Sequence, residues 1–299
     1  MQNKKVTATI SALVAQFIFG FSFMFTKIAL DFTTPMTVIA DRYIVAFFTM
    51  SIIMLFKKIK LKLSKNMLLL ILMAIFQPVM YFIFETYGIK LTTSGFSSVM
   101  ISLIPVVSIF GGIVFLKEIP SPLQYVFTII SVSGVVLMAY SGKMDGTVSF
   151  PGIILLFGAV LSSVAYNVLS RKISEEFTAF ERTYAMMAVG VIVFLIISFI
   201  ENIDNPANII INFKNPLYTY SMLYLGVISS VVAFLLLNYA NSYLPVSKTT
   251  VFSNITTVVS VSAGIICLNE KISVLIVISS LMIILGVWGV QFIKLKIKY

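Results

Sequence analysis

The stretch SVMISLIPVVSIFGGIVFLKE, residues 98–118, decides the fold, because it returns as TVFSNITTVVSVSAGIICLNE at residues 250–270. A shift of 152 residues aligns Tyr87 with Tyr239, Val106-Val107-Ser108 with Val258-Val259-Ser260, Leu116-x-Glu118 with Leu268-x-Glu270, and Gly134 with Gly286. Self-similarity at one long spacing indicates an internal duplication. We therefore predict two related halves, residues 1–145 and residues 146–299.

The composition places most of the protein surface in lipid. Hydrophobic residues make up 59% of the 299 residues and charged residues only 11%. An average soluble domain is about 45–50% apolar and about 25% charged, because it has to cover its outside with polar groups. So few charges indicate an all-α integral membrane protein, whose helices satisfy their own backbone hydrogen bonds in lipid.

Ten apolar stretches are long enough to cross a membrane. A hydrocarbon core about 30 Å thick requires roughly 20 mainly apolar residues per helix. We expect spans at about residues 8–30, 36–56, 67–90, 95–116, 122–141, 150–170, 179–200, 216–239, 246–268 and 272–293. The first stretch is too long for the apolar part of a signal peptide, so we expect it to be retained.

The distribution of basic residues sets the expected topology, because positive residues of membrane proteins gather in cytoplasmic loops. With the N-terminus inside, 14 of the 21 lysines and arginines fall on the cytoplasmic side and 4 on the other. We expect a multi-pass protein of the cell membrane with both termini in the cytoplasm. The excess of lysine over arginine, with abundant Ile and Asn, indicates an AT-rich bacterial genome, so we expect the bacterial inner membrane. The net charge of +10 lies in short loops beside the membrane, which indicates lipid headgroups rather than nucleic acid as the partner.

Five spans in each half force the second half to run through the membrane upside down, because five is an odd number. Inverted repeats are typical of secondary transporters, with a solute site near the midplane where the halves meet. The competing interpretation is a duplication that built only a large membrane scaffold. Upstream of the matched stretch, Asp41-Arg42 resembles Glu181-Arg182 at a shift of 140 residues, so the halves differ there in length.

A stripe of small and polar residues follows one face of the fourth span, and the ninth span repeats it. Its members are Ser98, Ser102, Pro105, Ser108 and Gly112, matched by Thr250, Asn254, Thr257, Ser260 and Gly264. Small residues let helices pack closely in lipid, so the stripe is either a packing seam or the wall of a polar cavity. The amide of Asn254 is larger than a tight seam prefers and favours the cavity.

Four ionisable residues lie within the first three expected spans, namely Lys27, Asp41, Arg42 and Glu85. Charges inside the membrane are costly and are functional candidates by default. One interpretation is a neutralised ion cluster that holds three helices in register, or side chains that reach the outer headgroups. The other concerns Glu85, because a carboxyl group in an apolar setting can take up a proton near neutral pH. We expect Glu85 to carry a coupling proton or to contact a cationic group of the solute.

Further polar side chains in the spans need partners away from lipid. Tyr81 belongs to the third span, Tyr166 and Asn167 to the sixth, and Asn238 to the eighth. Each either links two helices or contacts the solute. The candidate solute-binding residues are therefore Lys27, Tyr81, Glu85, Ser102, Tyr166, Asn167, Asn238 and Asn254.

The sequence lacks the usual residues of an enzyme site. It contains no histidine and a single cysteine, Cys267, within an apolar stretch. We therefore expect no catalytic site, no metal site and no cofactor. No phosphate loop of the GxxxxGK type occurs, which disfavours an ATP-driven pump, and the charge rings or carbonyl rings of a channel filter are not evident.

At these residues the chain resembles the ten-helix, EamA-like branch of the drug/metabolite transporter superfamily. The motifs that carry the resemblance are Pro105…Leu116-x-Glu118…Gly134, its second copy Leu268-x-Glu270…Gly286, and the run from Phe84 to Thr93. The second copy departs from the first at Thr257, which matches Pro105, and at Leu237, which matches Glu85. The resemblance implies a central cavity lined by spans 1, 3, 4, 6, 8 and 9, with spans 5 and 10 at the periphery.

Taken together, we predict a secondary active transporter with ten transmembrane helices in two inverted five-helix repeats. The resemblance implies export of small metabolites such as amino acids or drugs, driven by protons and working by alternating access. The alternative is a flippase of the same fold that moves a lipid-linked substrate. The expected partners are a small-molecule solute, the lipid bilayer and protons, and the expected state is a monomer or a homodimer.

Overall fold

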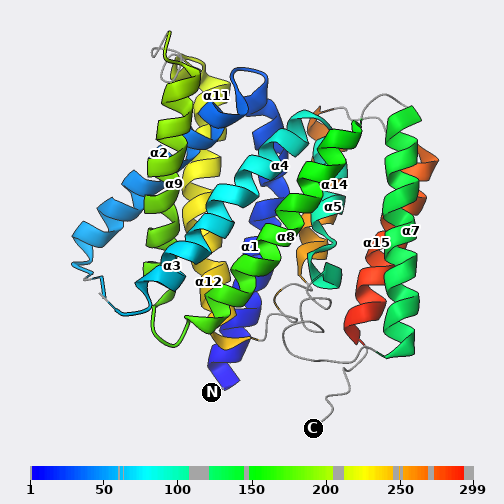
Figure 1. The fold of residues 1–299 in the computed structure, drawn as a ribbon, viewed down its shortest axis with the longest axis horizontal. Coiled ribbons are helices and arrows are strands. Elements are labelled where there is room, and N and C mark those ends of the chain that lie inside the picture. Colours follow the sequence, from blue (N-terminus) through cyan, green and yellow to red (C-terminus); the bar gives the residue numbers. More distant parts are fainter. Residues whose placement is uncertain are drawn as a thin grey trace.

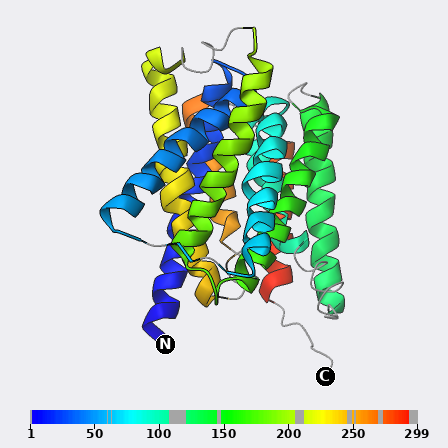
Figure 2. The same cartoon turned by 60° about the vertical axis from the view of Figure 1, so that its left-hand side comes forward.

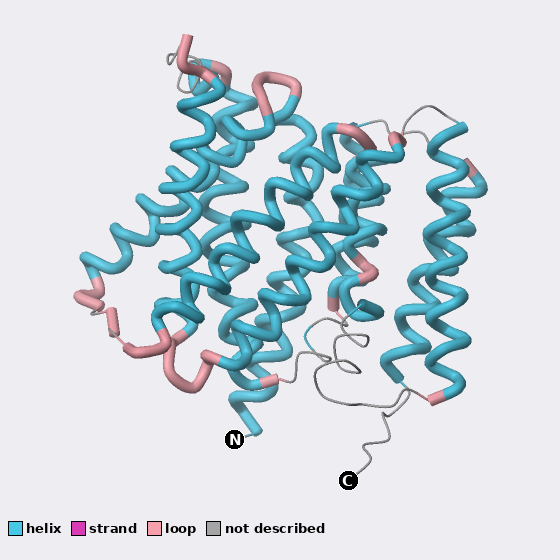
Figure 3. Tube along the Cα trace, in the orientation of Figure 1, coloured by secondary structure: helices cyan, strands magenta, loops and turns pink. Residues whose placement is uncertain are grey.

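The computed structural model describes residues 2–59, 61–62, 64–107, 121–144, 148–204, 212–244, 249, 252–268 and 273–292. Throughout these ranges the chain is helical or irregular, with no strand (Figure 3). The longer helices are α1 (Gln2–Leu30), α2 (Pro35–Phe56), α7 (Pro122–Met144), α8 (Phe150–Lys172), α9 (Ala179–Glu201), α14 (Ser253–Leu268) and α15 (Val274–Phe292). The remaining elements are α3 (Met67–Ala74), η1 (Ile75–Met80), α4 (Tyr81–Lys90), α5 (Ser94–Ile101), η2 (Asn212–Lys214), α11 (Pro216–Leu223), η3 (Tyr224–Ala233) and α12 (Phe234–Tyr243).

The ten expected spans all correspond to helices of the described chain. Six helical segments are long and apolar enough to cross a membrane: 4–30, 35–56, 67–90, 150–172, 179–201 and 216–243. Four shorter apolar helices fall in the other expected spans: Ser94–Val107, Tyr125–Gly134, Ile255–Leu268 and Val277–Gly286. The all-helical, membrane-spanning fold class is therefore confirmed.

The outer surface of the bundle is apolar, as contact with lipid requires. Large hydrophobic side chains such as Phe56, Leu68 and Ile266 are exposed by 86%, 75% and 77%. Many polar side chains are buried instead, including Gln77, Glu85 and Asn238. This is the reverse of a water-soluble protein, and it puts the polar chemistry in the interior.

The third and eighth spans each contain a π-helical segment in the middle. The third span runs through α3, the π-helical η1 and α4, and the eighth runs through α11, the π-helical η3 and α12. In the third span Gln77 leaves the helical conformation, with φ −143° and ψ 111°, and the helix is kinked there, because the residue before a proline, here Pro78, is driven out of the α region. Residues 77 and 78 match Ser229 and Ser230 at the repeat shift of 152, so the two π-helical segments lie at equivalent positions.

The fourth span is interrupted in the middle. α5 ends at Ile101 and a turn follows at Ser102, three residues before Pro105. In the second half α14 begins at Ser253, directly after a turn at Phe252. Discontinuous helices of this kind indicate where a transporter binds its solute.

The peripheral pair α7 and α15 shows how the two halves are related. These helices pack mainly on one another, at the edge of the bundle (Figure 1). A Cβ atom at Gly134 would lie 2.8 Å from Ser279 O, and one at Gly286 would lie 2.7 Å from Phe127 O. At the shift of 152, Gly134 matches Gly286 and Phe127 matches Ser279, so the repeat converts one contact into the other. From the first contact to the second, the residue number falls along α7 and rises along α15. The helices are therefore antiparallel about a local twofold axis that crosses the bundle, which is the geometry of an inverted repeat.

The other helix contacts follow the same twofold relation. α2 packs on α9 and α5 packs on α14, so each helix meets its own repeat partner. The contacts of α1 with η3 and α12 are mirrored by the contacts of α8 with η1 and α4. The start of α1 and the end of α15 lie at the same end of the bundle, as an even number of spans requires (Figure 2).

One cationic side chain in each half ties the first helix to the end of the third span. Lys27 Nζ donates to the carbonyl oxygens of Ile89 at 3.0 Å and Thr92 at 2.8 Å. Arg171 Nη1 donates to the carbonyl oxygen of Asn241 at 3.0 Å. Ile89 and Asn241 match at the shift of 152, so we call these two contacts the cation clamps. Both place positive charge at a helix C-terminus, where unsatisfied carbonyl groups favour it.

Candidate functional site

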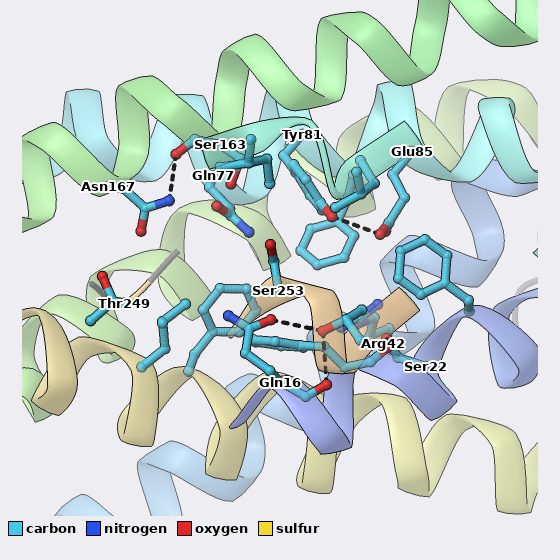
Figure 4. A pocket seen from close by; sticks show the side chains of 18 residues that line it. Gln16, Ser22, Arg42, Gln77, Tyr81, Glu85, Ser163, Asn167, Thr249 and Ser253 are labelled. Atoms are coloured by element: carbon cyan, nitrogen blue, oxygen red, sulfur yellow. Dashed lines mark hydrogen bonds between the residues drawn. The ribbon is translucent and has the colours of Figure 1, made fainter. Parts of the chain in front are cut away.

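A polar cavity lies in the centre of the bundle, between the two halves. The space between its lining atoms, counted together with the adjoining space that is open to the outside, is about 630 Å³. Its walls come from spans 1, 3, 4, 6, 8 and 9, as the sequence resemblance implies, together with Arg42 from the second span. The polar side chains around it converge from several helices (Figure 4).

Glu85 provides the acidic group of the cavity. It lies on α4 and is 4% exposed, and Tyr81 Oη, one turn earlier on the same helix, donates to Glu85 Oε1 at 2.8 Å. Leu237, the position that matches Glu85 in the second half, lines the same cavity. The two halves therefore present an acid and an aliphatic side chain at equivalent places, and the site is asymmetric.

Arg42 provides the basic group. Its Nε donates to Ser230 Oγ at 2.7 Å and its Nη2 donates to Ser229 Oγ at 3.0 Å. The guanidinium carbon lies 4.2 Å from the centre of the Phe82 ring, which is favourable for a cation over an aromatic face. Arg42 and Glu85 both line the cavity, so it holds one basic and one acidic side chain.

Gln77 adds a polar group without a partner. Its side chain lines the cavity at the kink of the third span, and its Oε1 is buried with no hydrogen bond to any described residue. Ser253 Oγ, at the start of α14, is likewise buried without a partner in the described part of the chain, and Ser253 lines the same cavity. Buried polar atoms are normally hydrogen-bonded, so these two oxygens are available to a molecule that enters.

Two further polar contacts close the wall of the cavity. Thr256 Oγ1 lies 2.8 Å from both the backbone oxygen and the Oε1 of Gln16, and it joins α14 to α1 across the two halves. Asn167 Nδ2 donates to Ser163 O at 2.9 Å, and its Oδ1 accepts from Asn241 Nδ2 at 3.2 Å.

In the described part of the chain, no group of three or more acidic, histidine or cysteine residues could hold a metal ion.

The comparison with known families decides the identity of this fold. The profile of the EamA-like transporter family matches residues 6–140 and, a second time, residues 150–292. The chain belongs to the EamA-like transporter family. This makes it a multi-pass membrane transport protein, whose partners are the lipid bilayer and a small-molecule solute.

Similar proteins support the family assignment. An uncharacterized transporter of Bacillus subtilis, YcxC, is 30% identical over 293 residues, with 97% of this chain and 94% of the relative covered. An uncharacterized transporter of Archaeoglobus fulgidus is 24% identical over 272 residues, with 90% and 93% covered. A solved crystal structure shares the fold, with a TM-score of 0.68 at 14% identity, and the match covers 94% of this chain and 97% of that chain.

Three of the predicted site residues of this EamA-like transporter line the cavity, namely Tyr81, Glu85 and Asn167. Ser102 is buried at the interruption of the fourth span, and its Oγ donates to Val99 O at 2.6 Å. Lys27 forms the first cation clamp, outside the cavity lining. The side chain of Asn254 lies outside the described residues.

Tyr166 and Asn238 belong to a separate polar network rather than to the cavity lining. Asn238 Oδ1 accepts from Tyr166 Oη at 3.0 Å and from Ser170 Oγ at 2.9 Å. Arg182, fully buried, donates to Ser170 Oγ at 2.7 Å and to the carbonyl oxygen of Asn238 at 2.7 Å. This Arg182 network joins α8, α9 and α12 within the second half. It fits the interpretation of these side chains as links between helices.

The ionisable residues within the first three spans make different hydrogen bonds. Lys27 donates to helix-end carbonyl groups and Arg42 donates to two serine hydroxyls. Asp41 accepts a hydrogen bond of 2.5 Å from Tyr218 Oη, and its Oδ1 is buried without a partner among the described residues. Of the four residues, Arg42 and Glu85 line the cavity. The ion cluster that would hold three helices in register stays a prediction.

Arg42, Gln77, Gln16 and Thr256 are cavity residues that the sequence-based set of candidates leaves out. A signal exists for two of them. Arg42 is a charge within a span, and Gln77 is a polar residue directly before a proline in an apolar segment, where a kink is expected. Which way either side chain points depends on the packing of the helices, and the sequence does not show it.

Proposed function

We propose that this protein is a secondary active transporter that binds a small polar metabolite, such as an amino acid or a drug, in the central cavity. The observation that carries the proposal is the cavity itself, which lies between two inverted halves and presents buried Glu85 and Arg42. A protein that only anchors or scaffolds has no use for an acid and a base buried together in the membrane, because burying charge is costly.

The solute contacts that we propose are Glu85, Tyr81 and Asn167, joined by Arg42 and Gln77. Lys27, Ser102, Tyr166 and Asn238 would act indirectly, by holding the helices that carry these contacts. The domain division at residues 145 and 146 fits this scheme, since each half contributes to the cavity wall.

Alternating access is the mechanism that the symmetry supports. Matching π-helical segments in spans 3 and 8 and the interruption of span 4 belong to helices that line the cavity. Such irregular segments let the ends of a helix move while its middle stays in place. The conformation that each half adopts when the cavity is open to the outside would then be adopted by the other half when the cavity is open to the cytoplasm.

Glu85 is the coupling residue in this proposal. A proton and a cationic or hydrogen-bond-donating group of the solute would compete for its carboxylate, which accepts a hydrogen bond from Tyr81 and shares the cavity with Arg42. On the outer side, a proton that binds Glu85 would displace the solute. On the cytoplasmic side, a new solute molecule would bind as Glu85 releases that proton. This exchange favours export, with both termini of the chain in the cytoplasm.

Reconstitution in liposomes tests this function. The purified full-length protein would be assayed for counterflow of labelled amino acids and other small metabolites, with and without a pH gradient. We expect at least one solute to exchange, and a pH gradient to drive its net movement against its concentration. Movement of a labelled lipid without any solute counterflow would instead support the flippase, and exchange of no solute across the panel would contradict the proposal.

A further inference from the structure

Arg42 is a buried cation that the hydrogen bonds of the protein leave partly unsatisfied. A guanidinium group stays charged at any relevant pH and has five N–H donors. In the described part of the chain, Arg42 donates only through Nε and Nη2, to Ser230 and Ser229, and not to a carboxylate. Nη1 has no partner among these residues, although Arg42 lines the central cavity. A strong donor therefore faces the space where a solute would bind.

The orientation of this guanidinium group is fixed by its neighbours. The two serine hydroxyls belong to the π-helical middle of the eighth span, and the Phe82 ring covers one face of the group at 4.2 Å. A side chain held in this way loses little further freedom when a ligand binds, which favours affinity. The positions matching the two serines in the first half are Gln77 and Pro78, of which Gln77 lines the cavity. One π-helical segment therefore contributes Gln77 to the binding surface, and the other orients Arg42.

The other buried arginine provides the contrast. Arg182 donates to the carbonyl oxygens of Ser170, in the last turn of α8, and of Asn238, within α12, and its Nε is buried without a partner among the described residues. Arg182 is not part of the cavity lining, whereas Arg42 is. Among the described residues no hydrogen bond joins Arg42 to Glu85, the acid of the same cavity. An anion that enters the cavity can therefore reach Arg42 and cannot reach Arg182.

We propose that Arg42 binds a carboxylate group of the transported solute. This inference rests on the proposed function, because it names the chemistry of the molecule carried. The planar guanidinium fork matches a carboxylate better than it matches any neutral group. The unpaired oxygen of Gln77 can then accept from a donor group elsewhere on the same solute. The cavity would select an acid over the corresponding amide.

A binding assay on the purified full-length protein tests this without requiring transport. The probes are acid and amide pairs of different size: acetate and acetamide, hexanoate and hexanamide, benzoate and benzamide, and N-acetylleucine and its amide. The protein would be heated at a series of probe concentrations, and the fraction that stays monodisperse would be measured. The probe concentration that gives half of the maximum protection reports the affinity. We expect at least one acid to bind 10-fold or more tightly than its amide, since hydrogen bonds to a charged group are worth about one to two powers of ten in affinity.

Two variants assign that preference to Arg42. Arg42→Gln should reduce the ratio of acid to amide affinity to about one, and Arg42→Lys should retain part of it, because the charge remains and the planar fork is lost. Arg182→Gln is the matched control, since it removes a buried guanidinium group outside the cavity. It should lower stability and leave the ratio unchanged. If Arg42→Gln does not give a monodisperse protein, the Ser229→Ala/Ser230→Ala double variant should lower the ratio at least threefold.

The outcomes separate this inference from the proposed function. Equal affinity for every acid and its amide, binding of no acid, or an acid preference that survives in folded Arg42→Gln would overturn the role of Arg42. Counterflow of neutral solutes together with any of these results would leave the transport function standing. Acid binding that depends on Arg42, without counterflow of that acid, would keep the inference and remove the proposed function.

Discussion

Asp41 and Arg42 are neighbours in the chain but serve different parts of the protein. Adjacent residues of a helix do not face each other, so Arg42 points into the cavity while Asp41 points to Tyr218 on α11. The distance of each arginine from the start of its helix also matters. Arg42 and Arg182 are 140 residues apart, whereas the N-caps of their helices, Thr34 and Thr178, are 144 residues apart. Arg42 therefore lies one helical turn further into α2 than Arg182 lies into α9, and of the two only Arg42 lines the cavity.

The Asp41–Tyr218 contact gives a test of stability at this scale. Tyr218→Phe leaves the buried carboxyl group without its hydrogen bond, which should cost about 1–3 kcal/mol and lower the temperature of unfolding by several degrees. Tyr220→Phe on the same helix is the control, because that ring is 67% exposed and should change little. Similar unfolding temperatures for the two variants, measured in one detergent, would show that the contact contributes nothing.

Glu85 gives a test of coupling. Glu85→Gln keeps the size of the side chain and a hydrogen bond from Tyr81, but it removes the group that exchanges a proton. We expect solute counterflow to continue while accumulation driven by a pH gradient falls at least 10-fold in liposomes. Tyr81→Phe retains the acid and should change the pH dependence without abolishing accumulation. Wild-type accumulation by Glu85→Gln would exclude Glu85 as the coupling residue.

At the scale of elements, close contact between helices depends on two matching glycines. The atoms that a Cβ would meet at Gly134 and Gly286 include backbone oxygens at 2.8 Å and 2.7 Å, and backbone cannot move aside as a flexible side chain can. Gly134→Ala and Gly286→Ala should each destabilise the protein by roughly 1–3 kcal/mol, the usual cost of overpacking. Ser133→Ala, on the exposed face of α7, is the control. Unfolding temperatures that agree across all three variants would contradict the tight contact.

The cation clamps can be separated from one another by hydrogen exchange. Lys27→Gln removes the charge held by the end of α4, so exchange should accelerate at residues 88–92 and stay unchanged at residues 239–244. Arg171→Gln should give the reverse pattern, because its partners lie at the end of α12. Each variant is the control for the other, and faster exchange at both segments in either variant would mean that the two clamps are not independent.

The course of the helices could be predicted from the sequence, whereas their interior contacts could not. Lipid demands a minimum apolar length, and this constraint gave boundaries close to those observed, such as 179–200 against Ala179–Glu201. The positions of the polar side chains inside the bundle are less constrained by the sequence, since a hydrogen bond to any buried partner satisfies them. Tyr166 and Asn238 are satisfied by the Arg182 network and Asn167 lies at the cavity. Their spacing in the sequence does not distinguish these outcomes.

At the scale of the whole molecule, the direction of the chain in the membrane is open to a direct test. The start of α1 and the end of α15 lie at one end of the bundle, and the basic loops favour the cytoplasm for that end. A reporter that fluoresces only in the cytoplasm should be active when fused to the C-terminus. A periplasmic phosphatase should be active when inserted between residues 204 and 212. The opposite pattern would reverse the proposed topology and the proposed direction of transport.

The antiparallel contact of α7 and α15 has a consequence for energetics. Because it is unchanged when the halves exchange roles, it can act as a fixed pivot while the remaining helices rock about it. An inward-open and an outward-open form would then be built from nearly the same set of contacts, with the labels of the halves swapped. Forms so alike differ little in free energy, and binding of one proton or one solute can tip the balance between them. Spin-label distances across each end of the empty protein should accordingly reveal both forms in comparable amounts.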